Sequence, residues 1–264
     1  MTVAMRLRLA ATFVCLTIGS LAMLIVAIPT LFLARRLYSE VLARWLGVVA
    51  LRIWGVRYRV HGHPQDADVQ TIYVSNHSST LDLFVLIALG LPRTRFFLSG
   101  FLRKTPPIGI VGALIRIFWT VPQEYPEKRV AIFKRADRIL RETGDSVYLS
   151  PEGMRVTTGE IGHFNKGSFH LATSLHAQIA PFYFSIPNEI NPGMGYDARP
   201  GSIDVYFLPP IDTSGWVLAD LERNRDAVRD LFVRVHESMR STGCLPSSLT
   251  IDAGPPVSPA EVLV

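Results

Sequence analysis

Residues 71–83 read TIYVSNHSSTLDL, and this stretch decides which fold the sequence predicts. Its first residues are mostly β-branched or aromatic, which is typical of a buried strand. A polar turn begins at Asn76, and an apolar stretch of helical character follows to Leu89. A strand that runs through a polar turn into a helix is the repeating unit of α/β proteins. Active sites of open sheets gather at that end of the strand.

The same alternation of short strands and helices continues on both sides of this stretch. We expect further strands at residues 56–60, 95–98, 117–121, 146–150, 179–184 and 203–207. Helices are expected at residues 79–89, 107–116, 126–142, 166–175 and 219–239. The sequence therefore predicts one α/β domain over residues 56–240, followed by an extended tail over residues 241–264 that contains several prolines.

Ahead of this domain, residues 9–34 contain no charged side chain over 26 positions. A helix of that length measures about 39 Å and exceeds the hydrocarbon core of a bilayer, which is about 30 Å thick. Arginines flank the stretch on both sides, at Arg6 and Arg8 and at Arg35 and Arg36, so charge assigns no orientation. A bend at Pro29 would turn the stretch into a membrane-embedded hairpin.

Residues 41–56 form a second apolar stretch, with Trp45 and Trp54 near its ends. Tryptophan is frequent at the level of the lipid headgroups, so we expect an interfacial helix here and a membrane anchor over residues 1–55 as a whole. The alternative for the first stretch is a signal peptide that is cleaved near Ser20-Leu21-Ala22. The apolar run continues for a dozen residues beyond that site, which favours a retained anchor.

The charged residues are unevenly distributed along the 264 residues, which carry 27 Lys and Arg and 22 Asp and Glu. Residues 1–60 hold eight basic side chains and one acidic side chain, whereas the remainder hold nineteen and twenty-one. A nucleic-acid-binding protein would place its basic residues on the folded domain, so this distribution argues against a nucleic-acid partner and favours membrane lipids. The two cysteines fit no disulfide framework and no metal motif, and we expect the domain to face the cytosol.

His77 lies in the polar turn after the strand at residues 71–75, and Asp82 follows five residues later. From the start of the next helix, the Asp82 carboxylate can reach back to one ring nitrogen of His77. Such a hydrogen bond fixes the tautomer of the ring and supports the imidazolium when the other nitrogen takes a proton. The pair is therefore a candidate general base, and the alternative is an N-capping turn that carries a surface histidine.

A second polar cluster follows the strand at residues 146–150. Glu152 can accept hydrogen bonds from hydroxyls, Gly153 lets a ligand approach the backbone, and Arg155 offers a guanidinium suited to phosphate. Lys166 adds a positive charge near the start of the next helix. The alternative is a solvated loop with a glycine turn, but two polar clusters at strand ends can face one active site.

The order and spacing of these blocks resemble the 1-acyl-sn-glycerol-3-phosphate (lysophosphatidic acid) acyltransferases and their glycerolipid acyltransferase relatives. The blocks are N-H-x4-D from Asn76 to Asp82, P-E-G-M-R at residues 151–155 and F-N-K-G at residues 164–167. The resemblance implies an α/β fold with a glycerolipid-acyltransferase-like mixed sheet flanked by helices, preceded by the membrane-embedded helical segment.

The resemblance also implies a reaction. A fatty acyl group would pass from acyl-CoA or acyl carrier protein to the hydroxyl of 1-acylglycerol-3-phosphate, with no metal and no further cofactor. His77 would be the base and Asp82 its orienting partner, while Glu152, Gly153, Arg155 and Lys166 would bind the acceptor lipid. The protein would sit at a membrane, for example the inner membrane of a bacterial cell, with its site facing the cytosol.

The sequence departs from the pattern of this family at two phosphate-binding positions. Gln123 stands where the family usually has an arginine, and Ser99-Gly100 stands where a lysine pair is expected. Both lost cations would hold a phosphate, so another lysophospholipid or a hydroxyacyl lipid stays open as the acceptor. The charged residues 124–141 are expected on a solvated helix face.

Three other classes of protein are weaker fits. A metal hydrolase would draw on His61 and His63 with His77, Asp82 and Glu152, but these residues lack a recognised metal-ligand spacing. A serine hydrolase would need a G-x-S-x-G elbow, which the sequence lacks. A catalytically inactive membrane lipid-binding protein would have no need of the intact histidine and aspartate.

Overall fold

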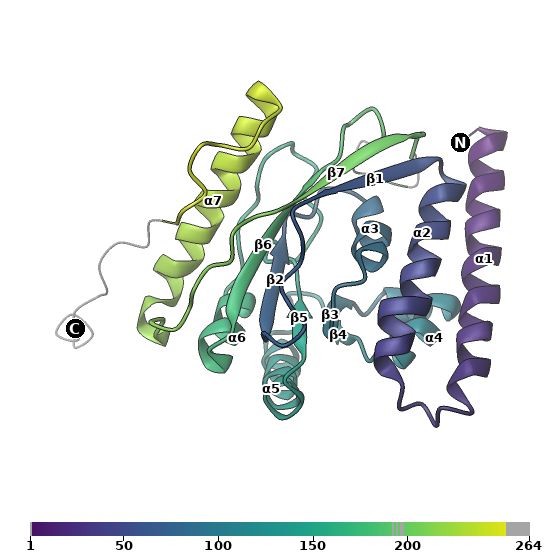
Figure 1. Cartoon of the computed structure of the whole chain (residues 1–264), viewed down its shortest axis with the longest axis horizontal. Helices are drawn as coiled ribbons and strands as arrows, with labels where there is room; N and C mark the ends of the chain where they lie inside the picture. Colours follow the sequence, from purple (N-terminus) through teal and green to yellow (C-terminus); the bar gives the residue numbers. More distant parts are fainter. Residues whose placement is uncertain (1, 192, 194, 196–197, 252–264) are drawn as a thin grey trace.

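Seven strands form one sheet in the order β1-β7-β6-β2-β5-β3-β4 in a computed structural model, which describes residues 2–191, 193, 195 and 198–251 (Figure 1). The pairs are parallel except for β6 and β7, which run antiparallel, so the predicted mixed sheet is confirmed. The strands are β1 (Val56–His61), β2 (Thr71–Ser75), β3 (Thr94–Ser99), β4 (Phe118–Thr120), β5 (Ser146–Tyr148), β6 (Gln178–Ser185) and β7 (Gly201–Phe207).

Helices cover both faces of the sheet, with α1 to α4 on one face and α5 to α7 on the other (Figure 1). They are α1 (Val3–Ala27), α2 (Arg44–Ile53), α3 (Leu81–Leu89), α4 (Pro106–Leu114), α5 (Pro126–Thr143), α6 (Gly167–Leu175) and α7 (Leu221–Thr242). A π-helical segment, η1 (Leu37–Ala43), leads into α2, and short 3-10 turns lie at Leu102–Lys104 and Leu218–Asp220. Each strand and helix predicted in the domain is present, with ends shifted by a few residues.

The middle of the sheet is built from strands that are buried on both sides. All five residues of β2 are buried, as expected for a parallel strand between two layers of helices. β2 pairs in parallel with β5, β5 with β3, and β3 with β4. The carboxyl ends of these four strands therefore meet at one edge of the sheet, and the loops that follow them can share one site.

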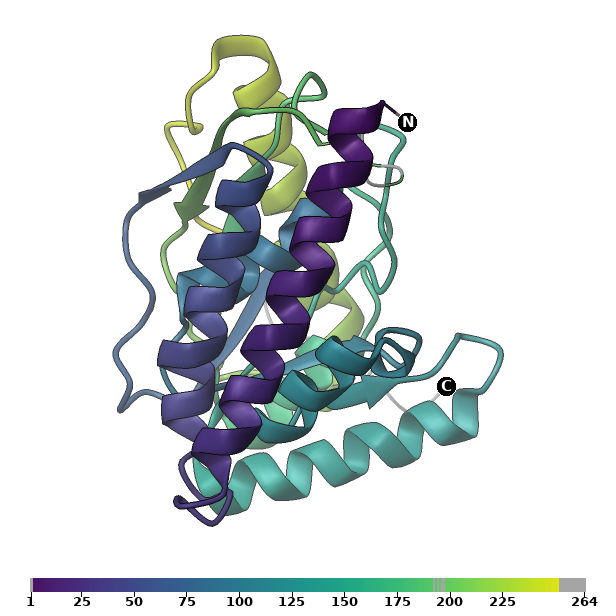
Figure 2. The same cartoon turned by 90° about the vertical axis from the view of Figure 1, so that its right-hand side faces the viewer.

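The amino-terminal segment folds as a helical hairpin. α1 ends at Ala27, just before Pro29, and the chain reverses so that α2 packs beside α1. Figure 2 shows α1 as the outermost helix, lying over α2 and α4. By length and composition, α1 is the one helix among the described residues that is long and apolar enough to cross a membrane. Its outer side carries exposed apolar side chains such as Phe13, Ile18 and Ile25.

This hairpin shares the hydrophobic core of the domain. Met23 of α1 and Leu51 of α2 are buried in the same cluster as Leu86 of α3 and Ile203 of β7. The core therefore crosses the boundary predicted at residue 55.

Trp54 is a correction to the expected interfacial helix. Its side chain is 4% exposed, and its Nε1 donates to Thr12 Oγ1 at 3.0 Å. Trp45 is 58% exposed, as a headgroup-level residue would be. The sequence pattern could not separate these two tryptophans because both lie in the same apolar stretch.

A buried group of charges also ties the hairpin to the sheet. Asp145, which precedes β5, accepts a hydrogen bond from Arg35 through one carboxylate oxygen and from Arg95 Nε at 2.8 Å through the other. All three side chains are at most 8% exposed. Buried charges are costly unless they are paired, and here the Asp145 carboxylate pairs with both guanidinium groups.

The chain after α7 packs on the domain as far as the structure describes it. α7 continues to Thr242, so the predicted tail begins two residues later than expected. Leu249 and Ile251 pack against the core beneath α7, and Arg234 Nη2 donates to the carbonyl of Thr250 at 2.6 Å. Residues 252–264 of the predicted tail lie outside the described residues.

Candidate active site

A cleft of about 490 Å³ lies where the carboxyl ends of β2, β3, β4 and β5 meet. It is lined by His77 after β2, Ser99 at the end of β3, Gln123 after β4 and Gly153 after β5. Strands that are distant in the sequence thus bring the two predicted polar clusters to one place, because they are neighbours in the sheet and run in the same direction.

Asp82 folds back onto His77, and both residues line the cleft. The Nδ1 atom of His77 lies 2.8 Å from Asp82 Oδ2. The same oxygen accepts hydrogen bonds from the backbone N–H groups of Ser78 at 2.8 Å and Ser79 at 3.0 Å. Asp82 therefore closes the turn that carries His77 as well as contacting its ring, so the capping turn and the candidate base are one structure.

The opposite nitrogen of the His77 ring, Nε2, lies on the side of the ring away from Asp82. The side chain of His77 is 31% exposed, whereas that of Asp82 is 3% exposed. Within the described residues, His77 Nε2 makes no hydrogen bond. A ring held by a carboxylate at Nδ1, on a side chain that is partly exposed, has the arrangement needed to take a proton from a hydroxyl.

Glu152 accepts a hydrogen bond from the backbone of the turn that contains His77. Its side chain is buried, and Glu152 Oε2 accepts a hydrogen bond from the backbone N–H of His77 at 2.6 Å. Glu152 Oε1 accepts one from the N–H of Gly162 at 2.8 Å. In return, the His77 carbonyl accepts a hydrogen bond from the N–H of Val156 at 2.8 Å. Both carboxylate oxygens of Glu152 are therefore engaged with the backbone of the protein.

Burial raises the pKa of Glu152 to about 6, although the N–H groups of Gly162 and His77 favour the ionised form. The desolvation of the carboxylate is the larger effect. The ionised form accepts both backbone hydrogen bonds, whereas a protonated carboxyl would give up one acceptor position. The position of the His77 turn is therefore linked to the charge state of Glu152.

Two asparagines brace the loops of the site. Asn76 exchanges two hydrogen bonds with the backbone of Phe184, at 3.0 and 2.8 Å, and so extends the pairing of β2 with β6 beyond Ser75. Asn165 Nδ2 donates to the carbonyls of Pro151 and Glu152, both at 3.0 Å. The sequence placed both residues in recognised blocks, but these backbone contacts depend on tertiary structure and were not predicted.

Of the remaining predicted site residues, Gly153 and Arg155 line the cleft and Lys166 does not. Gly153 has a φ of +71°, and a Cβ added there would lie 2.8 Å from Asn165 Nδ2, so the turn requires glycine. Arg155 lines the cleft and donates to Thr80 Oγ1 and to the Gly193 carbonyl, the latter at 2.9 Å. Lys166 does not line the cleft, because its ammonium pairs with Glu222 of α7.

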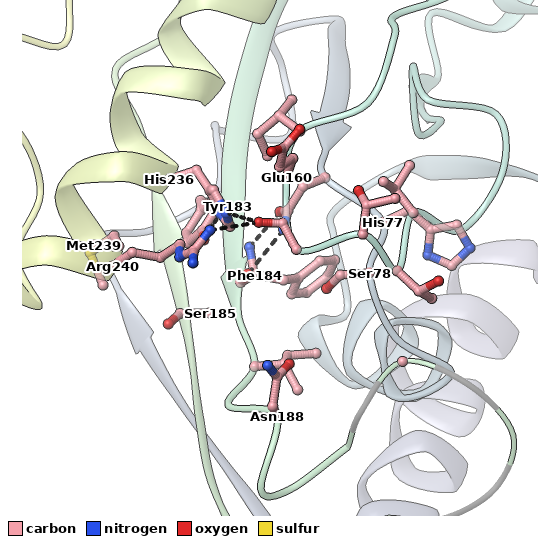
Figure 3. A pocket seen from close by; sticks show the side chains of 18 of the residues that line it. His77, Ser78, Glu160, Tyr183, Phe184, Ser185, Asn188, His236, Met239 and Arg240 are labelled. Carbon is pink, nitrogen blue, oxygen red and sulfur yellow. Dashed lines mark hydrogen bonds between the residues drawn. The ribbon is translucent and has the colours of Figure 1, made fainter.

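A second cavity of about 510 Å³ lies on the other side of the His77 turn. Figure 3 shows it between His77, the end of β6 at Ser185 and the side chains of His236 and Arg240 on α7. His236 lies 2.7 Å from the Tyr183 hydroxyl, and Arg240 donates to the Gly159 carbonyl at 2.9 Å. Its lining is mainly polar, with hydroxyl, amide and backbone groups, and the two cavities meet at His77.

Arg129 is a cleft residue that the sequence interpretation missed. It was expected on the solvated face of the helix at residues 126–142, yet it is half-buried and lines the cleft. Helical spacing could have predicted this position, because Arg129 shares the inward side of α5 with Phe133, Ala136 and Leu140.

The histidines considered for a metal site lie elsewhere. His61 is on β1, separated from β2 by β7 and β6, and its ring stacks on Tyr206 and contacts Asp204. In the part of the chain that the structure describes, no group of three or more His, Cys, Asp or Glu side chains is arranged to hold a metal ion.

Comparison with known proteins agrees with this geometry. Residues 57–185, which contain β2 to β6, all but the first residue of β1, and the polar residues of the His77 and Glu152 loops, match the family model described as Acyltransferase. This stretch of the chain is therefore similar to an Acyltransferase domain.

The relatives that this chain resembles carry a consistent name. A 1-acyl-sn-glycerol-3-phosphate acyltransferase of Limnanthes douglasii is 26% identical over 204 residues, which cover 72% of this chain and 66% of that protein. One of Haemophilus influenzae is 27% identical over 207 residues, covering 75% and 79%. The chain thus spans just under two thirds of the Limnanthes protein.

A solved structure shares the fold. The crystal structure of the 1-acyl-sn-glycerophosphate (LPA) acyltransferase PlsC from Thermotoga maritima superposes with a TM-score of 0.66 at 20% sequence identity. The match covers 89% of this chain and 98% of that one.

Proposed function

We propose that this protein transfers a fatty acyl group from a thioester to the hydroxyl of a lysoglycerolipid, with His77 as the general base. The observation that carries the proposal is the contact of 2.8 Å between His77 Nδ1 and the buried carboxylate of Asp82, while the His77 side chain is partly exposed and lines the cleft. A base held in this way serves one reaction class well, the attack of a hydroxyl on an activated carbonyl.

The reaction follows from these positions. The acceptor hydroxyl hydrogen-bonds to His77 Nε2 and loses its proton to it as the oxygen attacks the thioester carbonyl. The Asp82 carboxylate supports the imidazolium that forms. As the tetrahedral intermediate collapses, the carbon–sulfur bond breaks, the new ester remains, and the imidazolium returns its proton to the departing thiolate. No acyl-enzyme is formed.

The two cavities that meet at His77 provide room for two substrates. The cleft carries two arginines, Arg129 and Arg155, and suits an acceptor with an anionic headgroup. The second cavity is lined largely by hydroxyl, amide and backbone groups, which match the amide-rich arm of coenzyme A or of acyl carrier protein. We assign the acceptor to the cleft and the carrier arm of the donor to the second cavity.

The favoured acceptor is 1-acylglycerol-3-phosphate, which would yield phosphatidic acid. The names of the relatives support this choice, and Arg155 lies at the cleft to meet a phosphate. Another lysophospholipid or a hydroxyacyl lipid is the alternative acceptor. The exposed apolar face of α1 supports a location at a membrane. We propose that Gly153, Arg155 and the catalytic pair lie on its cytosolic side.

Mass spectrometry of reaction products tests this function. The purified protein is mixed with acyl-CoA or acyl carrier protein thioesters and a panel of lysophospholipids, monoacylglycerol and a hydroxyacyl lipid. The expected result is one or more diacyl products, with phosphatidic acid formed fastest. Absence of any acylated product from every pair, with a folded protein, would contradict the proposal.

A further inference from the structure

Arg129 stands out among the charged residues of the cleft. Arg129 and Arg155 are the lysine or arginine side chains that line the cleft within the described residues. Arg155 is held by Thr80 and the carbonyl of Gly193, whereas the side chain of Arg129 makes no hydrogen bond or ion pair with any described residue. Arg129 is partly exposed and has no counter-charge from the described residues, so an anion that enters the cleft can pair with its guanidinium.

The position of Arg129 on α5 fixes its direction. Phe133, one turn later, stacks on Phe97 of β3 with ring centroids 4.9 Å apart and also lines the cleft. A Cβ added to Gly167, the first residue of α6, would lie 2.5 Å from the Phe133 ring. Arg129 therefore continues the inward side of α5 toward the cleft, close to the start of α6.

Two helices begin at this end of the cleft. Gln123 and Glu124, just before α5, line the cleft, and so do Asn165 and Ser168 at the start of α6. No side chain caps either helix, and the hydroxyl of the buried Ser168 has no hydrogen-bond partner. Helix amino termini carry partial positive charge, so they repel a nearby cation and attract an anion. The exposed Glu124 is the one carboxylate at this end of the cleft among the described residues.

We propose that Arg129, together with the amino terminus of α6, binds the phosphate of the acceptor lipid and replaces the cation that Gln123 lacks. The inference rests on the proposed function, and it names the headgroup as a phosphomonoester. An anionic headgroup bound here would pair with the Arg129 guanidinium and would also accept hydrogen bonds from the N–H groups at the start of α6. The acceptor hydroxyl can then lie at His77 Nε2, at the other side of the same cleft.

The test compares two arginines of α5. Arg129→Gln removes the cleft cation, and Arg135→Gln removes the same charge from an exposed position outside the cleft. With 1-acyl-sn-glycerol-3-phosphate and saturating palmitoyl-CoA, Arg129→Gln should raise KM for the acceptor by about 10- to 100-fold, as the loss of a charge-assisted hydrogen bond predicts. The turnover number and the KM for palmitoyl-CoA should change by less than about threefold, and Arg135→Gln should leave all three unchanged.

A rescue variant and a binding measurement complete the test. Gln123→Arg in the Arg129→Gln protein restores a cation to the cleft and should recover most of the acceptor KM. Equilibrium dialysis with radiolabelled short-chain 1-acylglycerol-3-phosphate needs no turnover, and Arg129→Gln should weaken that binding while thermal unfolding stays unchanged. Equal acceptor KM and equal binding in the wild-type and Arg129→Gln proteins would overturn the inference. If the wild-type protein binds this lipid through Arg129 but acylates nothing, the proposed function fails and the headgroup site stands.

Discussion

At the level of single residues, one oxygen of Asp82 both closes the turn that contains His77 and contacts the His77 ring. Asp82 Oδ2 accepts hydrogen bonds from two backbone N–H groups and contacts the His77 ring, while the buried Oδ1 has no hydrogen-bond partner in the part of the chain that the structure describes. An asparagine could keep its oxygen in the place of Oδ2 and put its amide where Oδ1 lies. The geometry would survive, whereas the negative charge that, in the proposed mechanism, supports an imidazolium at His77 would be lost.

We therefore expect Asp82→Asn to lower the turnover number by about 10²- to 10⁴-fold, the range typical of general-base assistance. Initial rates of acyl transfer measure this effect, and circular dichroism checks the fold. Asp66→Asn, at an exposed position, serves as the matched control and should keep wild-type turnover. A folded Asp82→Asn protein with near wild-type turnover would show that the carboxylate charge is not needed.

Glu152 gives a prediction for pH. Its pKa in the folded protein is about 6 against an ordinary value of 4.5, so the folded state binds this proton more tightly than the unfolded state. The contribution of this group to the free energy of unfolding is then fully present below pH 4.5 and is lost as pH rises through about 6. The total loss is about 2 kcal/mol at 1.36 kcal/mol per pKa unit.

Glu152→Gln removes this titration. Chemical denaturation of both proteins between pH 4.5 and 7 should show that the difference in unfolding free energy, wild type minus variant, falls as pH rises. The variant should also have low activity at every pH, since the glutamine amide offers one acceptor to the two backbone N–H groups of His77 and Gly162. A pH-independent difference in unfolding free energy would mean that Glu152 has an ordinary pKa.

At the level of elements, the sequence predicted the domain well because each signal was local. β-branched and aromatic runs marked the strands, and the ends of β2 coincide with the predicted residues 71–75. The helix at Pro126–Thr143 was equally clear from its proline start and Gly144 end. What depended on packing was not predictable: the burial of Trp54, the pairing of Lys166 with Glu222 and the inward direction of Arg129 are set by distant elements.

The outer face of α1 carries a prediction for membrane binding. Ile18 and Ile25 lie seven residues apart on this face and are 63% and 68% exposed. Replacing both by lysine should strongly reduce binding to vesicles of phosphatidylglycerol and phosphatidylethanolamine, because each buried isoleucine contributes about 1.5–3 kcal/mol. Flotation with vesicles measures the bound fraction.

Val130→Lys is the matched control for this experiment. Val130 is an exposed apolar residue, at 53%, but it lies on α5 rather than on α1. The control protein should bind vesicles as the wild type does. Equal binding of the double α1 variant would place the membrane contact on another surface.

At the level of the whole molecule, the amino-terminal hairpin and the domain share one hydrophobic core. Tyr38, Leu51 and Trp54 are buried against residues of the sheet and of α3, and Arg35 shares the buried Asp145 with Arg95. The sequence placed a boundary at residue 55 because composition changes there. Composition reports where apolar residues are, but it does not show that one side of a lipid-exposed hairpin also completes the core.

Deletion of residues 1–55 should therefore prevent folding rather than release a soluble enzyme. The truncated chain would expose the core face of α3 and leave Asp145 with one partner. Soluble yield and cooperative thermal unfolding, followed by circular dichroism, measure the outcome. The full-length protein with Ile18→Lys and Ile25→Lys should unfold as the wild type does, and native-like unfolding of the truncated chain would show that the hairpin is dispensable for folding.

The most direct test of the account is the rate of acyl transfer in the His77→Ala protein. With the wild-type fold and membrane binding verified, turnover of 1-acyl-sn-glycerol-3-phosphate with an acyl thioester should fall by at least about 10²- to 10⁴-fold, because the base that takes the hydroxyl proton is gone. Acceptor binding should persist, since the headgroup contacts lie elsewhere in the cleft. Wild-type turnover by the folded His77→Ala protein would contradict the assignment of His77 as the general base.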